Sequence, residues 1–329
     1  MIMQVEMPKI ELYRVRTFTE KLTDTFNFLR ESWRPMLKYF LYMMLPVSII
    51  LALPFNHFFE GYMKLVTTID KGNFFSSTDM WLYGASAVGS VVLGIIAFLL
   101  LQSLVFAMVR VYNRRPERLK DLFYTDFRDD LFFCLKRSFI EMLVGLGLII
   151  VIMIVFVLLV ELTFALGAAV GAVVSVLGVI LLYVALIAFA FPMMMVTPVY
   201  LLEDEIGVFA AFKKGLRLGF KTWGGIFALL FVMGIISSIL QTFTMMPWYL
   251  MSVVKMVFTI SSDMDKPFFH SFIYSFVQYL TCILMLLGYM LSEILSYVSV
   301  TIQYGHASEK IDGVGVSKRI DKFDEFDNF

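Results

Sequence analysis

Long apolar runs dominate this sequence and restrict the folds that are open to it. Crossing a bilayer takes about 20 mostly apolar residues. Backbone groups in hydrocarbon must hydrogen-bond within their own segment, so unalternating runs of this length predict transmembrane α-helices. Such runs cover residues 36–55, 81–109, 139–160, 163–191, 223–243 and 272–303.

The composition agrees with a membrane protein. Of the 329 residues, 60% are apolar and 16% are charged, whereas a soluble domain has about 45–50% and about 25%. One globular core cannot hide that surplus, so membrane lipids are expected partners. The net charge of zero gives no reason to expect a nucleic-acid partner. The first apolar run is long enough to span, so we expect it to remain as a helix rather than be cleaved as a signal peptide.

The third and fourth runs are separated only by Glu161 and Leu162. A single helix through both would be about twice as long as a bilayer is thick, so a tight hairpin is the better interpretation. We therefore predict an all-α polytopic transmembrane bundle of about six spans in three hairpins.

The distribution of Lys and Arg predicts the orientation. Of 27 such residues, 23 fall in segments that a six-span topology places on the side of the two termini. Cytoplasmic loops carry the excess of basic residues, so both termini are expected in the cytoplasm. The expected parts are an interfacial segment 1–35, a transmembrane domain 36–303 and a flexible tail 304–329. The four basic residues on the outer side are Lys64, Lys71, Lys255 and Lys266.

Amphipathic stretches precede the first, third and fifth runs, at residues 18–33, 122–135 and 208–220. Apolar residues three and four positions apart give each one an apolar stripe. Helices of this kind lie in the membrane interface, where Lys and Arg meet anionic head groups. Ordinary cytoplasmic loops remain the alternative. The candidate head-group contacts are Arg114, Arg115, Arg128, Lys213, Lys214 and Arg217.

Polar side chains inside the runs are the candidate functional groups, because burying them in a membrane is costly. Glu293 is the first candidate, since it lies well inside the sixth run with apolar neighbours. It could form a structural hydrogen bond between helices, handle protons or ions, or face water at the cytoplasmic end. Gln102, Gln241 and Gln278 could hydrogen-bond between helices and complete a candidate intramembrane polar site.

The sequence contains no pattern of a known catalytic or cofactor site. Nothing resembles GxSxG, HExxH, GxxxxGK[ST] or GxGxxG in a fitting context. His57 and His270 have acidic neighbours on the outer side but lack the spacing of a metal site. We therefore expect no catalytic, cofactor-binding or metal-binding residues and no cofactor.

Residues 245–260 are apolar but contain Lys255. They could form an interfacial helix, a re-entrant helix or a further span. A seventh span would place the C-terminus outside, against the charge distribution. We favour an interfacial or re-entrant helix whose lysine extends to the interface.

One stretch resembles a known family. Residues 197–227, TPVYLLEDEIGVFAAFKKGLRLGFKTWGGIF, resemble the signature of a broad bacterial group of six-helix membrane proteins. The group includes the membrane domain attached to some glycerophosphodiester phosphodiesterases and stand-alone members of Bacteroidetes type. The family pattern often has Ser where this chain has Gly215. The matching positions are Pro198, Glu203, Asp204, Ala211, Phe212, Lys213, Lys214, Trp223 and Gly224.

The resemblance implies a six-helix fold in a bacterial inner membrane. It does not imply phosphodiesterase activity, because the chemistry of that enzyme resides in a separate soluble barrel. We predict a non-enzymatic scaffold, assembly factor or envelope component that could meet a protein partner at its cytoplasmic face. The alternative is a small transporter or lipid-handling permease that uses Glu293 in a cavity between helices.

Overall fold

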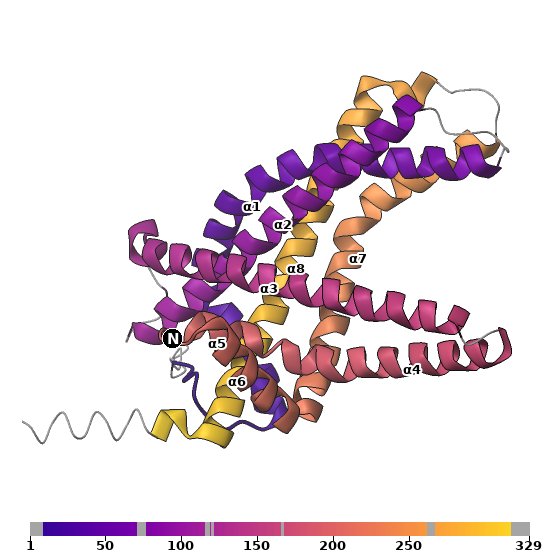
Figure 1. Cartoon of the computed structure of the whole chain (residues 1–329). Helices are drawn as coiled ribbons and strands as arrows, with labels where there is room; N and C mark the ends of the chain where they lie inside the picture. The colour runs from indigo at the N-terminus through magenta and orange to yellow at the C-terminus, as the bar shows by residue number, and fades with distance from the viewer. Residues whose placement is uncertain are drawn as a thin grey trace, which may run out of the picture. The chain divides into compact units, whose positions relative to one another are not determined.

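The computed structural model describes residues 9–70, 77–115, 119, 122–165, 168–261 and 267–316. All regular structure in these ranges is helical, as predicted from the apolar runs. Figure 1 shows the helices in chain order. They are α1 (Phe18–Asp70), α2 (Ser77–Arg114), α3 (Tyr124–Ala165), α4 (Ala168–Met193), α5 (Val196–Leu202), α6 (Val208–Lys221), α7 (Trp223–Ser261), the 3₁₀-helix η1 (Pro267–His270) and α8 (Phe272–Asp312).

Six helical stretches in the described ranges are long and apolar enough to cross a membrane. Five of them contain one predicted run, and the stretch Val170–Leu202 contains most of the run 163–191, whose first residues belong to α3. The prediction of a polytopic helical bundle is confirmed. The stretches extend beyond the predicted runs because polar residues at the ends continue the helices. They are Phe18–Leu65, Ser77–Arg114, Tyr124–Leu162, Val170–Leu202, Trp223–Phe258 and Phe272–Asp312.

Two of the three amphipathic stretches continue directly into a span, and the third is a separate helix. Residues 18–33 are the first turns of α1, and most of 122–135 forms the first turns of α3, so neither is a separate helix. Residues 208–220 lie in the separate helix α6, which ends at Lys221 and is capped by Thr222. There the Thr222 N–H bonds to the carbonyls of Leu218 and Gly219, and α7 begins at the next residue.

Residues 245–260 belong to α7 rather than to an interfacial or re-entrant helix of their own. The helix continues through Pro247, whose ring removes one backbone hydrogen bond without ending the helix here. The Lys255 ammonium pairs with the Glu60 carboxylate at 2.5 Å. This pair satisfies the charge within the protein, and the extension of Lys255 to the membrane interface stays a prediction.

The C-terminal segment is more ordered than predicted. The tail was expected to begin at residue 304, yet α8 continues to Asp312. Tyr304, Ala307 and Ser308 are buried, and this burial explains why the helix extends. The remainder of the expected tail, 317–329, lies outside the described residues.

The chain divides into two compact units, each described here by itself. The first unit comprises residues 1–30, 106–231 and 298–329. Its core gathers residues of α5, α6, α7 and α8 around the fully buried Tyr304. Helices α5 and α6 approach closely because Gly215 faces Val196: an added Cβ would lie 2.9 Å from the Val196 nitrogen. In the same unit, α3 and α4 lie side by side as a hairpin (Figure 1).

The second unit comprises residues 31–105 and 232–297. Hydrogen bonds from aromatic side chains join its helices. The Tyr279 hydroxyl donates to the Ile49 carbonyl at 2.6 Å, and the Trp248 indole N–H donates to Asn56 Oδ1 at 2.9 Å. Each bond gives a polar group on an otherwise apolar side chain a partner inside the unit.

Candidate functional site

Two of the four predicted intramembrane polar residues meet in the second unit. The Gln241 amide of α7 donates to the Ser292 hydroxyl at 2.8 Å and to the Glu293 carboxylate at 3.5 Å. The Ser237 hydroxyl donates to the Ser292 carbonyl at 3.2 Å. Glu293 is half-buried and is therefore held by a polar contact between α7 and α8.

The other two glutamines do not join this contact. Gln102 of α2 and Gln278 of α8 are both buried. In the described part of the chain, Gln241 is the side chain that hydrogen-bonds Glu293. The predicted polar site therefore reduces to Gln241 and Glu293, with Ser292 added by the structure.

The six predicted head-group contacts lie in the first unit, and five of them pair with acidic side chains. Arg114 pairs with the buried Asp130. The other pairs are Arg115 with Asp126 at 2.7 Å, Arg128 with Asp129 at 3.2 Å, Lys214 with Glu203 at 2.6 Å and Arg217 with Asp312 at 2.7 Å. Lys213 is exposed on α6. Head-group contact stays a prediction for all six.

A pair of arginines that the sequence analysis did not select holds the end of α5. The Arg137 guanidinium donates to the carbonyls of Tyr200, Glu203 and Asp204. The Arg110 guanidinium donates to the Leu201 carbonyl at 3.0 Å. The last carbonyls of a helix have no partner within it and carry partial negative charge, so two cations at this end stabilise the short helix.

The same arginines are themselves fixed by stacking and charge. Both guanidinium groups lie over the Phe133 ring, at 4.3 Å for Arg110 and 4.4 Å for Arg137. Arg110 also bonds the Asp130 carboxylate at 2.9 Å and pairs with Asp204. Because their donors are occupied by the protein, these arginines act as structural ties between α2, α3 and α5. In the sequence, the acidic turn Glu203–Asp204 was the feature from which basic partners such as these arginines could have been expected.

Glu203 connects three helices of the first unit. Its carboxylate accepts hydrogen bonds from Lys214 at 2.6 Å and from the Tyr304 hydroxyl at 2.7 Å. The Tyr304 hydroxyl lies 3.5 Å from that of Tyr13, and burial raises the pKa of Tyr13. Glu203, Lys214 and Gly215 all belong to the family-like stretch, which therefore serves packing and ion pairing in this unit.

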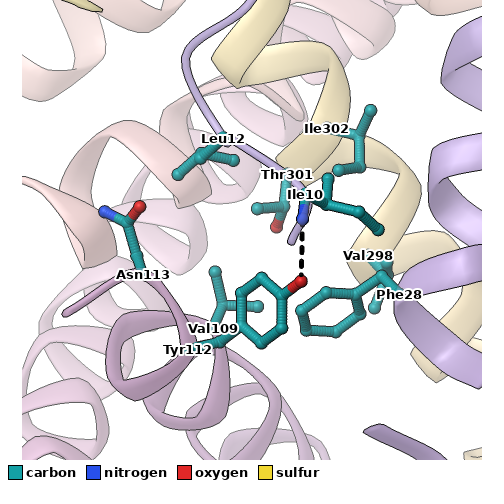
Figure 2. Close-up of a pocket in the computed structure, with 9 residues that line it drawn as sticks. All are labelled: Ile10, Leu12, Phe28, Val109, Tyr112, Asn113, Val298, Thr301 and Ile302. Atoms are coloured by element: carbon teal, nitrogen blue, oxygen red, sulfur yellow. Dashed lines mark hydrogen bonds between the residues drawn. The ribbon is translucent and has the colours of Figure 1, made fainter. Parts of the chain in front are cut away.

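A small cavity lies beside the N-terminal segment in the first unit, and Figure 2 shows its lining. The Ile10 N–H donates to the Tyr112 hydroxyl at 3.0 Å, and the Phe28 ring packs edge-on against the Tyr112 ring. The cavity measures about 20 Å³, room for about one water molecule. It is too small for an organic ligand. Elsewhere in the described ranges, no three His, Cys, Asp or Glu side chains gather to hold a metal ion.

The fold and these contacts define a multi-pass helical membrane protein. Comparisons of the chain with protein-family models, with curated proteins and with solved structures found no match. The resemblance of residues 197–227 to a bacterial membrane-protein group therefore stays a prediction.

Proposed function

We propose that this protein is a non-enzymatic scaffold or assembly component of a bacterial inner membrane, with both termini in the cytoplasm. In this proposal it binds another membrane protein through the α3–α4 hairpin, and the basic residues of the first unit face the cytoplasm. The observation that carries the proposal is that the rest of the described chain leaves the side chains of this hairpin exposed.

The hairpin is the least buried part of the candidate spans. In the most apolar stretch of α3 and of the span formed by α4 and α5, 0% of the residues are buried, against 56% in α2 and 50% in α8. Lipid can cover such a surface, since hydrocarbon is as apolar as the side chains. The shape of the surface is the stronger argument for a partner.

A groove runs between the two helices of the hairpin. It has a volume of about 360 Å³, which is large enough for bulky side chains. Only apolar and aromatic residues line it, including Phe156 on α3 and Val179 and Tyr183 on α4. Helices associate in membranes through van der Waals packing of complementary surfaces, and a ridge of side chains on a partner helix fits this groove.

The test is photo-crosslinking in cells that produce the tagged full chain. Benzoylphenylalanine replaces Phe156 in the groove or, as a control, the comparably exposed Phe98 of α2. We expect one defined protein, identified by mass spectrometry, to crosslink at Phe156 and not at Phe98. Adducts with lipid alone at Phe156, or the same proteins from both positions, contradict the proposal.

A matched pair of variants shows whether the groove itself binds the partner. Val179→Phe fills the groove, whereas Val184→Phe adds the same ring at another exposed position of α4. The crosslink from Phe156 is expected to disappear in Val179→Phe and to persist in Val184→Phe. Equal crosslinking in both variants would place the partner elsewhere.

A second candidate function is a small transporter or lipid-handling permease, and the contact of Glu293 with Gln241 favours it. An ionisable residue held by polar groups within spans is a candidate for proton-coupled transport. Glu293→Gln keeps the shape and removes the titrating group. In proteoliposomes that contain a pH-sensitive dye, proton flux above that of empty liposomes and its loss in Glu293→Gln would support the permease. Equal flux in both proteins, or none in the unaltered one, would exclude a proton-coupled permease.

A further inference from the structure

The first turns of α1 place two polar side chains inside the first unit. Lys21 and Thr25 are buried, at 5% and 0% exposure, together with Phe28 on the same face. Phe18 and Phe26 are exposed. Thr23 and Arg30 on the same turns are exposed, so Lys21 and Thr25 are polar residues that this part of the helix buries. The arrangement brings a lysine ammonium into the interior of the unit.

Two buried polar groups flank the start of α7. A Cβ built on Gly225 would lie 3.5 Å from Lys21 Nζ and 3.5 Å from Gln303 Nε2. Gln303 of α8 is 1% exposed, and neither its amide nitrogen nor its amide oxygen has a hydrogen-bond partner in the described part of the chain. Buried polar groups are almost always hydrogen-bonded, so this amide has a donor and an acceptor that a ligand could use.

The backbone at this place also offers donors. Gly224 and Gly225 are in the first turn of α7, a helix of 39 residues. First-turn N–H groups have no acceptor within the helix and lie at the positive end of its dipole. No side chain covers this turn at Gly224, where an added Cβ would meet nothing within 4 Å. The backbone of this turn is therefore uncovered at Gly224.

The charges around Lys21 are positive. The charged groups that act on it most strongly are Lys310 and Arg16. Arg16 is already satisfied by the Asp24 carboxylate at 2.7 Å and by three carbonyls of the N-terminal segment. No carboxylate in the described residues pairs with the Lys21 ammonium. A buried charge without a partner is costly, and a bound anion would remove that cost.

We propose that Lys21, Gln303 and the first-turn N–H groups at Gly224 and Gly225 form a binding site for a phosphate oxyanion. A phosphate offers several acceptor oxygens to one ammonium, one amide and a helix N-terminus, the combination that binds phosphates in many proteins. Trp223, which precedes the site, is a residue enriched at membrane interfaces. The phosphate of a lipid head group and a free phosphate both carry the required chemistry. The site lies apart from the α3–α4 groove and does not depend on the proposed scaffold function.

The test measures thermal unfolding of the purified full chain in mild detergent. A ligand that binds the native state raises the unfolding midpoint by mass action. The probes are inorganic phosphate against chloride at equal ionic strength, and phosphatidic acid against diacylglycerol with the same acyl chains. We expect phosphate, phosphatidic acid or both to raise the midpoint above that of the matched control. A rise with phosphate alone identifies a free phosphate, and a rise with phosphatidic acid alone identifies a lipid. No specific rise with either probe overturns the proposal.

Glycine variants test the location of the site with little disturbance of the fold. In Gly225→Ala the new methyl group meets Lys21 and Gln303 at ordinary contact distances of 3.5–3.9 Å and occupies the space where the anion would bind. Gly234→Ala is the control in the same helix, with nothing within 4 Å of the added Cβ. We expect the apparent Kd of the active probe to rise about tenfold or more in Gly225→Ala and to remain unchanged in Gly234→Ala. Equal affinity in the two variants overturns the proposal.

Side-chain variants separate a binding role from a structural one. Lys21→Met removes the ammonium and keeps an unbranched chain, so binding should weaken about tenfold or more. Gln303→Leu removes two unpartnered buried polar atoms, which should leave the unliganded midpoint unchanged or higher while binding weakens. If Gln303→Leu instead lowers the unliganded midpoint and binds the probe with unaltered affinity, Gln303 is structural and the proposed site is wrong.

Discussion

Gly219 of α6 lies directly against Pro192 of α4. A Cβ added to Gly219 would lie 2.8 Å from both the Cβ and the carbonyl oxygen of Pro192. The contact is with backbone and a rigid ring, so neither side can move away by rotating a side chain. Glycine at this position therefore permits the close approach of α4 and α6, and with it the position of the α3–α4 hairpin in the first unit.

Gly219→Ala is expected to destabilise the protein. Forcing a methyl group into a filled contact costs about 1–3 kcal/mol, more than the gain in helix propensity of about 1 kcal/mol from replacing Gly by Ala. Thermal unfolding in mild detergent measures the effect. Gly145→Ala is the control, since its Cβ would meet nothing within 4 Å, and it should be neutral or stabilising. A Gly219→Ala protein as stable as the control would mean that α4 and α6 are not packed as described.

Arg137→Lys is expected to weaken the attachment of α5 to α3. The lysine keeps the charge but cannot reach three carbonyls with one planar group, and it loses the stacking on Phe133 and Tyr200. Hydrogen bonds from charged donors contribute about 1.5–3 kcal/mol each, so a loss of about 2 kcal/mol is expected after partial replacement by the ammonium.

The control for Arg137 is Arg128→Lys. Arg128 pairs with its neighbour Asp129 at an exposed site, where an ion pair contributes about 0–1 kcal/mol. Denaturation in a mixed-detergent series should therefore separate the two variants clearly. Equal stabilities would show that the guanidinium geometry at Arg137 is unimportant.

The spans could be predicted from the sequence because hydropathy is a property of contiguous residues. Five of the six apolar runs fall within one helix whatever their neighbours are, and the run 163–191 begins in the last residues of α3. The helix ends were harder to predict from the sequence. Tyr304 and Ser308 extend α8 because they pack inside the first unit, not because of local helix propensity.

The polar contacts were much harder to predict. Gln241 and Glu293 were both selected as polar residues in apolar runs, and the structure brings them together. Lys21 belongs to the amphipathic stretch 18–33, whose basic residues were expected at the membrane interface, yet it lies inside the first unit. Its neighbours Gly225 and Gln303 are about 200 residues or more away in the chain. No periodicity within one helix reports contacts of this kind.

The proposed orientation predicts which loops a membrane-impermeant reagent reaches. Phe123 and Met80 are both 66% exposed and lie on opposite sides of the expected topology. The native cysteines, Cys134 and Cys282, are buried and should give little background. In intact spheroplasts, a charged maleimide is expected to label Met80→Cys and to label Phe123→Cys only after permeabilisation. The reverse pattern would invert the orientation and move the basic residues to the outer side.

Arg217 was expected from the sequence to contact lipid head groups. In the structure both Asp312 oxygens accept from its Nη2 at 2.7 Å, which joins α6 to the end of α8. Reversing one charge, in Arg217→Asp or Asp312→Arg, places like charges together and should cost about 0.5–1 kcal/mol, because the pair is partly exposed. The double exchange should restore most of the loss if the two residues act on each other. A lipid contact predicts another result: Arg217→Asp would weaken binding to anionic vesicles, and Asp312→Arg would not restore it. Unfolding midpoints and vesicle binding of the four proteins together show which partner Arg217 uses.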